Sequence, residues 1–179
     1  PLHQRVTMHG DAGDDLLRVQ PARDTPYDIV LEGGAGKDTF SIDWLPSQGS
    51  LLVTDFQAGA GGDVLDVFDI ADVALGDISP FATGQYRFVQ RGADTVLQID
   101  ASGKGEHKDF VTLKNVDKDQ LVAANMTHGL DPSGATAGLG WTGTDAGEYR
   151  TGDWLDDQLR GGGGDDILDG SRGNDLLDG

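Results

Sequence analysis

The chain has 179 residues, enough for one domain or two small ones. It carries 31 acidic and 13 basic residues, a formal net charge of −18, which argues against nucleic acid and against an anionic membrane surface as partners. There is no cysteine, so disulfides are excluded, and no apolar run approaches the length of a transmembrane segment.

Residues 1–40 contain two copies of a nine-residue pattern, G-G-x-G-x-D-x-U-x, in which U is apolar. The copies are Gly10–Arg18, with Asp11 in the second glycine place, and Gly33–Ser41. Apolar and β-branched runs around them predict strands at 6–8, 16–19, 29–31 and 39–42. The second copy starts one eighteen-residue coil plus a five-residue insert after the first. This spacing predicts that the Asp15 and Asp38 turns stack as neighbours.

Residues 41–128 have few tandem glycines and more alternation, which predicts a separate β-rich module. We expect strands at 51–56, 63–68 and 110–113, and a β-hairpin of 86–90 with 94–100. Asp117 is a candidate N-cap for one short helix over residues 117–126. The apolar residues of these segments form the expected core: Phe56, Leu65, Phe68, Phe88, Leu97, Ile99, Val111 and Leu113.

Residues 129–142 are small and punctuated by proline and glycine, which is typical of a linker. Residues 143–179 then continue in units of nine. The last two units, Gly161–Asp169 and Gly170–Asp178, keep glycine at the first and fourth places and an apolar residue at the eighth. A flexible glycine-rich linker has no reason to keep that apolar position.

The two units before Gly161 are degenerate. Gly152–Arg160 has Leu155 in a glycine place, and Gly143–Thr151 has Glu148 in the aspartate place. Stacking by eighteen residues pairs the Asp157 turn with the Asp175 turn, and the Glu148 turn with the Asp166 turn.

This nonapeptide is the signature of a calcium-binding parallel β-roll, and at the repeats the chain resembles the RTX (repeats-in-toxin) family of bacterial secreted proteins. Glycine permits left-handed turns and close backbone approach, and Ca²⁺ takes carboxylate and carbonyl oxygens. The expected fold class is all-β. Parallel β-roll coils at 1–40 and 143–179 would flank a β-sandwich-like capping module, 41–128, with one short helix.

The order of segments in 41–128 resembles the module that closes many RTX arrays, in serralysin-type metalloproteases, alginate epimerase R-modules and type I secretion target domains. Its conserved parts would be Asp38–Phe40, Thr54–Phe56 and Asp63–Val67 here. The chain departs from that pattern at Gly59–Gly62, where two extra residues precede Asp63. A calcium site that uses Asp55 and Asp63 is therefore left open.

The resemblance implies Ca²⁺ as the bound ion. The expected side-chain ligands are the aspartates of the turns: Asp15, Asp38, Asp157, Asp166 and Asp175, with Asp63 as a further candidate. The expected carbonyl ligands are the first and third residues of the turns: Gly10, Ala12, Gly33, Ala35, Gly161, Gly163, Gly170 and Arg172. The eighth-place residues would fill the rolls: Leu17, Phe40, Leu159, Leu168 and Leu177. Residues 21–26, with two prolines, would make a poor calcium turn.

Calcium is also expected to order the chain. Residues 143–179 contain ten acidic residues and three arginines, so the segment repels itself without counter-ions. Because the ion neutralises the carboxylates, its binding free energy becomes folding free energy.

The sequence gives little sign of catalytic, EF-hand or sugar-binding sites. The four histidines are scattered without H-E-x-x-H, and there is no cysteine nucleophile and no G-x-S-x-G, so no catalytic residue is expected. Residues 100–106 lack the spacing of an EF-hand and are expected to be a hairpin connection. Trp44, Trp141 and Trp154 are expected to be packing residues rather than sugar platforms.

The resemblance implies a non-catalytic, calcium-folded module of a larger secreted protein, which leaves the cell through a type I secretion apparatus. The alternatives are an accessory module of an extracellular enzyme, such as an alginate epimerase, lyase or metalloprotease, and a glycan-binding adhesin segment. An acidic polysaccharide is a possible partner of the parent protein. The start at Pro1 and the stop inside a repeat at Gly179 suggest a piece of a longer chain, in which the second roll is only half built.

Overall fold

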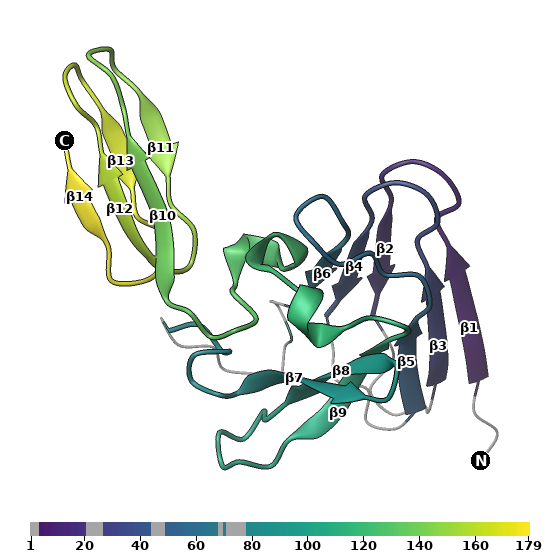
Figure 1. Ribbon diagram of the computed structural model, residues 1–179. Coiled ribbons are helices and arrows are strands. Elements are labelled where there is room, and N and C mark those ends of the chain that lie inside the picture. The colour runs from purple at the N-terminus through teal and green to yellow at the C-terminus, as the bar shows by residue number, and fades with distance from the viewer. Residues whose placement is uncertain (1–3, 21–26, 44–48, 68–69, 71–77) are drawn as a thin grey trace.

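The computed structural model describes residues 4–20, 27–43, 49–67, 70 and 78–179. In these ranges the regular elements are strands and three short 3₁₀ helices, which confirms the all-β class with parallel β-roll coils (Figure 1). No helix within them is both long and apolar enough to cross a membrane. The predicted half-coil 21–26, Trp44 and Phe68 lie outside the described residues.

The N-terminal part of the chain is a stack of three coils. Its strands are β1 (Gln4–His9), β2 (Leu16–Val19), β3 (Tyr27–Glu32), β4 (Thr39–Ile42), β5 (Gly49–Val53) and β6 (Val64–Asp66). β1, β3 and β5 pair in parallel in one sheet, and β2, β4 and β6 pair in parallel in another. The expected boundary between residues 40 and 41 falls inside this stack, because β5 and β6 form its third coil.

The eighth-place residues explain why the coils stack. Leu17 pairs with Phe40, and Phe40 pairs with Leu65, across neighbouring strands of one sheet. All three side chains are buried, and they share one hydrophobic core with Leu31 and Val53 of the other sheet. Since side chains alternate along a strand, this register places every second residue inside the roll.

An antiparallel extension completes the larger sheet. Its strands are β7 (Tyr86–Arg91), β8 (Asp94–Ile99) and β9 (Lys108–Leu113), and β9 pairs in parallel with β5. The pairing of β7 with β8 confirms the predicted hairpin. β8 pairs antiparallel with β9, so residues 100–106 are a hairpin connection as expected. Of the predicted core, Phe88 is partly buried and the other described members are buried.

The prediction of one short helix over 117–126 is wrong in detail. Three single-turn 3₁₀ helices follow β9: η1 (Lys118–Gln120), η2 (Ala123–Asn125) and η3 (Thr127–Gly129). Asp117 does cap the first of them, accepting the Asp119 N–H at 3.0 Å. The helix cannot continue because Leu121 is extended and buries its side chain in the core.

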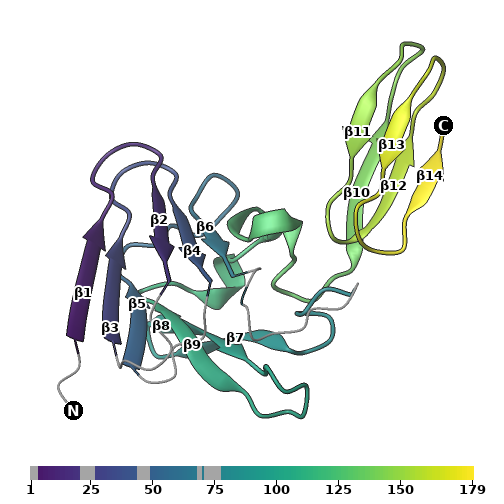
Figure 2. The ribbon, with the colours of Figure 1, turned by 180° about the vertical axis from the view of Figure 1, so that it is seen from behind.

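The C-terminal part of the chain is a second roll. Its strands are β10 (Ala137–Thr142), β11 (Tyr149–Thr151), β12 (Asp156–Arg160), β13 (Ile167–Asp169) and β14 (Leu176–Asp178). β10, β12 and β14 form one parallel sheet, and β11 and β13 form the other. Figures 1 and 2 show this roll as a narrow arm that projects from the N-terminal body.

Strand β10 lies inside the range 129–142 that was expected to be a linker. It pairs with β12, with Trp141 opposite Leu159. Trp141 therefore occupies the eighth place of a unit, Gly134–Thr142, that extends the repeat by one more step of nine. Its small residues resemble a linker in sequence because only the first place, Gly134, and the eighth, Trp141, keep the pattern.

Candidate calcium-binding turns

The aspartates of the N-terminal turns form a ladder. The backbone N–H of Asp15 donates to Oδ1 of Asp38 at 3.0 Å, and the N–H of Asp38 donates to Oδ1 of Asp63 at 2.9 Å. Each sixth-place carboxylate therefore holds the equivalent residue one coil earlier. The predicted stacking of the Asp15 and Asp38 turns is confirmed, and Ala12 pairs with Ala35 in a parallel bridge beside them.

The C-terminal turns repeat this arrangement at a spacing of eighteen residues. The N–H of Glu148 donates to Oδ1 of Asp166, and the N–H of Asp157 to Oδ1 of Asp175, each at 2.9 Å. Both predicted pairs are confirmed. A third pair extends the ladder, because the N–H of Leu139 donates to Oδ1 of Asp157 at 2.5 Å.

Three of these carboxylates keep an unused oxygen. Oδ2 of Asp15, of Asp38 and of Asp166 is buried and has no hydrogen-bond partner among the described residues. Buried polar atoms are almost always paired, so an orphaned carboxylate oxygen requires an explanation. Hard cations bind carboxylate oxygens in combination with backbone carbonyls, and the residues at these turns fit Ca²⁺ on that ground.

The other three candidate aspartate ligands differ. Asp157 accepts the Asp153 N–H on Oδ2 at 2.8 Å, so both of its oxygens hold backbone N–H groups. Asp63 is 1% exposed and accepts the Gln57 N–H on Oδ2 at 2.8 Å, so both of its oxygens are also in use. Asp175 is only partly buried, in the turn that directly precedes β14, the edge strand of its sheet.

In the four turns that match the repeat well, glycine at the first place is required by the aspartate at the sixth. A Cβ built on Gly33, Gly161 or Gly170 would overlap the carboxylate of the aspartate five residues later. A Cβ on Gly10 would lie 3.0 Å from the Asp15 carboxylate and closer still to the Gly33 carbonyl oxygen. The first glycine therefore makes the space in which the carboxylate sits.

The third-place residues hold neighbouring turns together through their backbones. The Ala35 N–H donates to the Asp11 carbonyl, and the Ala35 carbonyl accepts the Gly13 N–H, each at 2.8 Å. In the second roll the Gly163 N–H donates to the Thr144 carbonyl at 2.8 Å, and the Arg172 N–H to the Asp153 carbonyl at 3.4 Å. These contacts fix the spacing of successive turns.

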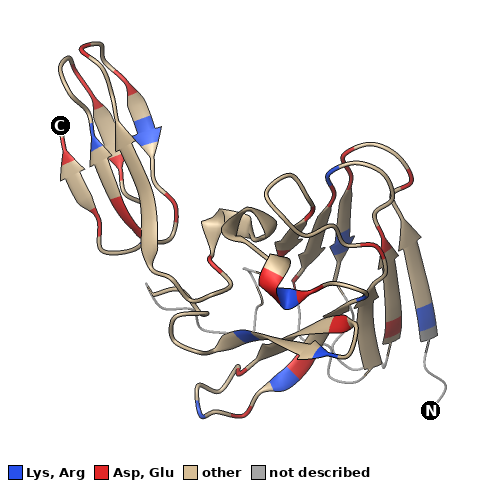
Figure 3. Ribbon diagram, viewed as in Figure 1, with Lys and Arg blue, Asp and Glu red and all other residues tan. Residues whose placement is uncertain are grey.

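Acidic residues gather along the turns of both rolls (Figure 3). Burial raises the pKa of Asp63 above its usual value, and the nearby charges of Asp38 and Asp55 raise it further. Burial likewise raises the pKa of Asp153, beside Asp157 and Asp175. Among the side chains that the structure describes, His, Cys, Asp and Glu nowhere form a group of three or more that could hold a metal ion.

Sequence reasoning missed one turn in the first roll. Ala58–Asp66 aligns with the nonapeptide, since Asp63 joins the ladder at the sixth place and Leu65 pairs with Phe40 at the eighth. The signal was the Asp63-x-Leu65 pair. An unusual order of glycines, at 59, 61 and 62, concealed it.

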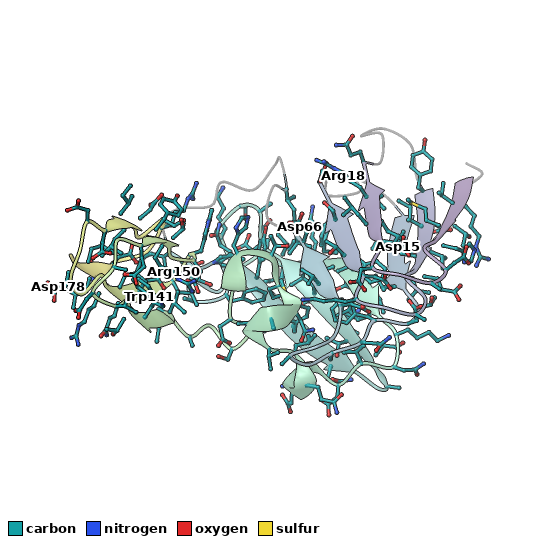
Figure 4. All side chains as sticks on the ribbon, turned by 90° about the horizontal axis from the view of Figure 1, so that it is seen from above. Asp15, Arg18, Asp66, Trp141, Arg150 and Asp178 are labelled. Atoms are coloured by element: carbon teal, nitrogen blue, oxygen red, sulfur yellow. The ribbon has the colours of Figure 1, made fainter. Side chains whose placement is uncertain are left out.

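The described tryptophans are engaged in packing. Trp154 is 8% exposed, stacks with the His128 ring at 5.5 Å and lies 3.9 Å from the Arg172 guanidinium. Trp141 lies below Arg150, 5.8 Å from its guanidinium carbon, inside the second roll (Figure 4). Both rings thus pack against neighbouring side chains, as expected for packing residues.

A comparison with known protein families identifies the repeats of the second roll. Residues 151–179 match the family profile of the RTX calcium-binding nonapeptide repeat (4 copies). No curated protein and no solved structure matches the chain. By this match and by its parallel coils, the C-terminal part of the chain is similar to an RTX calcium-binding β-roll.

Proposed function

We propose that the chain is a calcium-folded, non-catalytic module of a larger secreted bacterial protein of the RTX type. The observation that carries this proposal is the Oδ2 of Asp15, Asp38 and Asp166, which is buried, has no hydrogen-bond partner in the described part of the chain and lies against a glycine of its turn. A cation there would satisfy oxygens that the described residues leave without partners.

The proposed ligands fall into two groups. Asp15, Asp38 and Asp166 supply the unpaired carboxylate oxygens, and Asp157 and Asp175 act in the weaker turns of the second roll. Carbonyl oxygens come from the first and third places of the turns: Gly10, Ala12, Gly33, Ala35, Gly161, Gly163, Gly170 and Arg172. Asp63 contributes to the ladder through its hydrogen bonds to the backbone.

Calcium would act as the folding switch of the module. The second roll has a net charge of −7 over residues 143–179 and few fully buried apolar side chains, so it gains most from neutralisation by the ion. Extracellular calcium modules bind with dissociation constants on the order of 10⁻⁴–10⁻³ M. Such a module stays unfolded at low cytosolic calcium, passes a type I secretion apparatus and folds outside the cell.

Circular dichroism and hydrogen exchange of the full chain, with calcium and with a chelator, test the proposal. We expect chelation to remove β-structure from the second roll and protection from the Asp15 and Asp38 turns. The β7–β9 hairpin strands should keep residual protection, because their apolar side chains reach the main core. Identical spectra and protection in both conditions would refute calcium-dependent folding.

The parent protein decides between a purely structural role and an accessory role beside a catalytic or adhesive domain. An acidic polysaccharide is the partner that a calcium-bridged acidic surface would favour. A binding assay with alginate, run with calcium and with a chelator, distinguishes the two: a structural module binds in neither condition, whereas an accessory module binds only with calcium.

A further inference from the structure

The third turn of the first roll, residues 54–63, differs from the two turns before it. Asp15 and Asp38 each keep a buried oxygen that no described residue contacts by a hydrogen bond, whereas both oxygens of Asp63 accept backbone N–H groups. The turn is closed further by its own backbone. The Asp63 N–H donates to the Gln57 carbonyl at 2.8 Å, and the Gly62 N–H to the Gly59 carbonyl at 3.0 Å.

A single side chain from a distant segment fills this turn. Asn125 is 0% exposed, and its Nδ2 donates to the carbonyls of Asp63 at 2.8 Å and Gly59 at 2.9 Å. The Gln57 carbonyl is a third oxygen, 3.5 Å from the same nitrogen. Three carbonyl oxygens thus converge on one point, as they do around a bound cation, and an amide NH₂ group occupies that point.

The amide oxygen of Asn125 is also fully hydrogen-bonded. Its Oδ1 accepts the N–H of Gly59 at 2.8 Å and that of Val122 at 3.1 Å. An amide can donate two and accept two hydrogen bonds, so this one reaches its full capacity while buried. A buried network that is fully satisfied holds its elements in one arrangement.

Asn125 also stands where a fourth coil would begin. Met126 pairs with Leu65 in a parallel bridge, as Leu65 pairs with Phe40, and η2 lies beside β6 (Figure 2). The carbonyls of Asp15 and Asp38 each accept an N–H from the next coil at 2.8 Å. The carbonyl of Asp63 instead accepts the Asn125 amide.

We propose that Asn125 replaces a calcium ion at the third turn, so that this turn is held by protein groups alone. It is folded before any ion binds, and it presents the Asp63 carboxylate as the template on which the Asp38 turn is ordered. The template role of Asp63 rests on the proposed function, because it requires that the other turns depend on calcium. The ion-free third turn is inferred from the contacts of Asn125 alone.

Hydrogen exchange in chelator, on the full chain, tests it. In the wild type the amides of Gly62 and Asp63 should stay protected, whereas those of Gly13 and Ala35 should exchange freely. Asn125→Asp is isosteric but removes the donor and places a carboxylate oxygen against the three carbonyls. It should lower the protection of Gly62 and Asp63 at least about tenfold, the scale expected when a buried group loses its partner. Gln120→Glu makes the same chemical change at an exposed position of η1 and should leave protection unchanged.

Calcium should then distinguish two variants. In Asn125→Asp the new carboxylate and the carbonyls form an oxygen cage, so added calcium should restore the protection of Gly62 and Asp63. Asn125→Ala offers no carboxylate and should not recover. The β8 amide of Leu97 reports whether either variant still folds. If the third coil melts together with β8, recovery by calcium in Asn125→Asp but not in Asn125→Ala still supports the proposal.

The proposal is overturned if the wild-type Asp63 amide exchanges as freely as that of Ala35 in chelator. It is also overturned if Asn125→Asp matches the wild type in chelator, or if both variants recover equally in calcium. A different result would refute the proposed function. In that case the Gly13 and Ala35 amides of the wild type would exchange at the same rate with calcium as with chelator.

Discussion

The two carboxylate oxygens of Asp38 have different environments. Its Oδ1 accepts the backbone N–H of Asp15 at 3.0 Å from the preceding coil, and its Oδ2 is buried without a hydrogen-bond partner among the described residues. One oxygen therefore fixes the register of the coils, and the other is left for an ion. Register and ion binding share one side chain, which makes the turn sensitive to calcium.

Asp38→Ala should weaken the tighter calcium-binding step more than Asp175→Ala weakens it. Asp38 is 0% exposed, while Asp175 is partly exposed in the turn before β14, the edge strand of its sheet. Removing a buried charged ligand costs roughly 1.5 kcal/mol or more, at least about tenfold in affinity. Isothermal titration calorimetry with calcium checks this order. Loss of the tighter site in Asp175→Ala, with the weaker site lost in Asp38→Ala, contradicts it.

Gly33→Ala should disrupt the second turn, whereas Gly61→Ala should be tolerated. A Cβ at Gly33 overlaps the Asp38 carboxylate, while a Cβ at Gly61 meets no atom of a described residue within 4 Å. Forcing an extra carbon into a packed site costs about 1–3 kcal/mol, and here it also displaces the proposed ligand. Urea unfolding at fixed calcium measures both variants. Equal midpoints would show that the carboxylate can move aside.

Arg150→Leu should stabilise the second roll. Arg150 takes the eighth, inward-facing place opposite Leu168, and its Nε is buried without a partner among the described residues (Figure 4). A leucine there removes the unpaired polar group and adds apolar burial, a gain of about 1–2 kcal/mol. Arg160→Leu, at an exposed position of β12, is the matched control. A lower thermal midpoint for Arg150→Leu than for the wild type would show that contact with Trp141 outweighs the burial cost.

The Asp100 carboxylate should make the stability of the folded protein fall as the pH is lowered into the acid range. Hydrogen bonds from the Ser102 hydroxyl, and from the Gly105 and Ser102 N–H groups, lower the pKa of Asp100 from 3.8 to about 2. Because the folded pKa lies below the unfolded one, its contribution is present above about pH 4 and is lost as pH falls through about 2. Asp100→Asn should therefore be less stable than the wild type at pH 6, and the difference should shrink towards pH 2.

Thermal unfolding of the two proteins at fixed calcium measures that difference across the range. Glu106→Gln, an exposed change in the same connection, is the control and should give a pH-independent offset. A gap between Asp100→Asn and the wild type that stays constant from pH 6 to pH 2 would mean that the carboxylate gains nothing from these donors.

The repeats determine the local architecture from sequence alone. Eighteen-residue stacking, the Asp15–Asp38 pair and the hairpin of β7 with β8 follow from patterns that recur within a few residues, so each was predicted and confirmed. The physical reason is that a glycine-aspartate turn and an alternating strand each restrict their own backbone.

The tertiary structure alone decided what joins these parts. The third coil was hidden because the glycines of its turn stand at unusual places, and strand β10 because its residues are small. Asn125 gave no signal in the sequence, since its partners Gln57, Gly59 and Asp63 lie more than sixty residues away. A side chain that satisfies distant backbone groups is defined by packing and by the demand that buried polar atoms be paired, and neither is written in a local pattern.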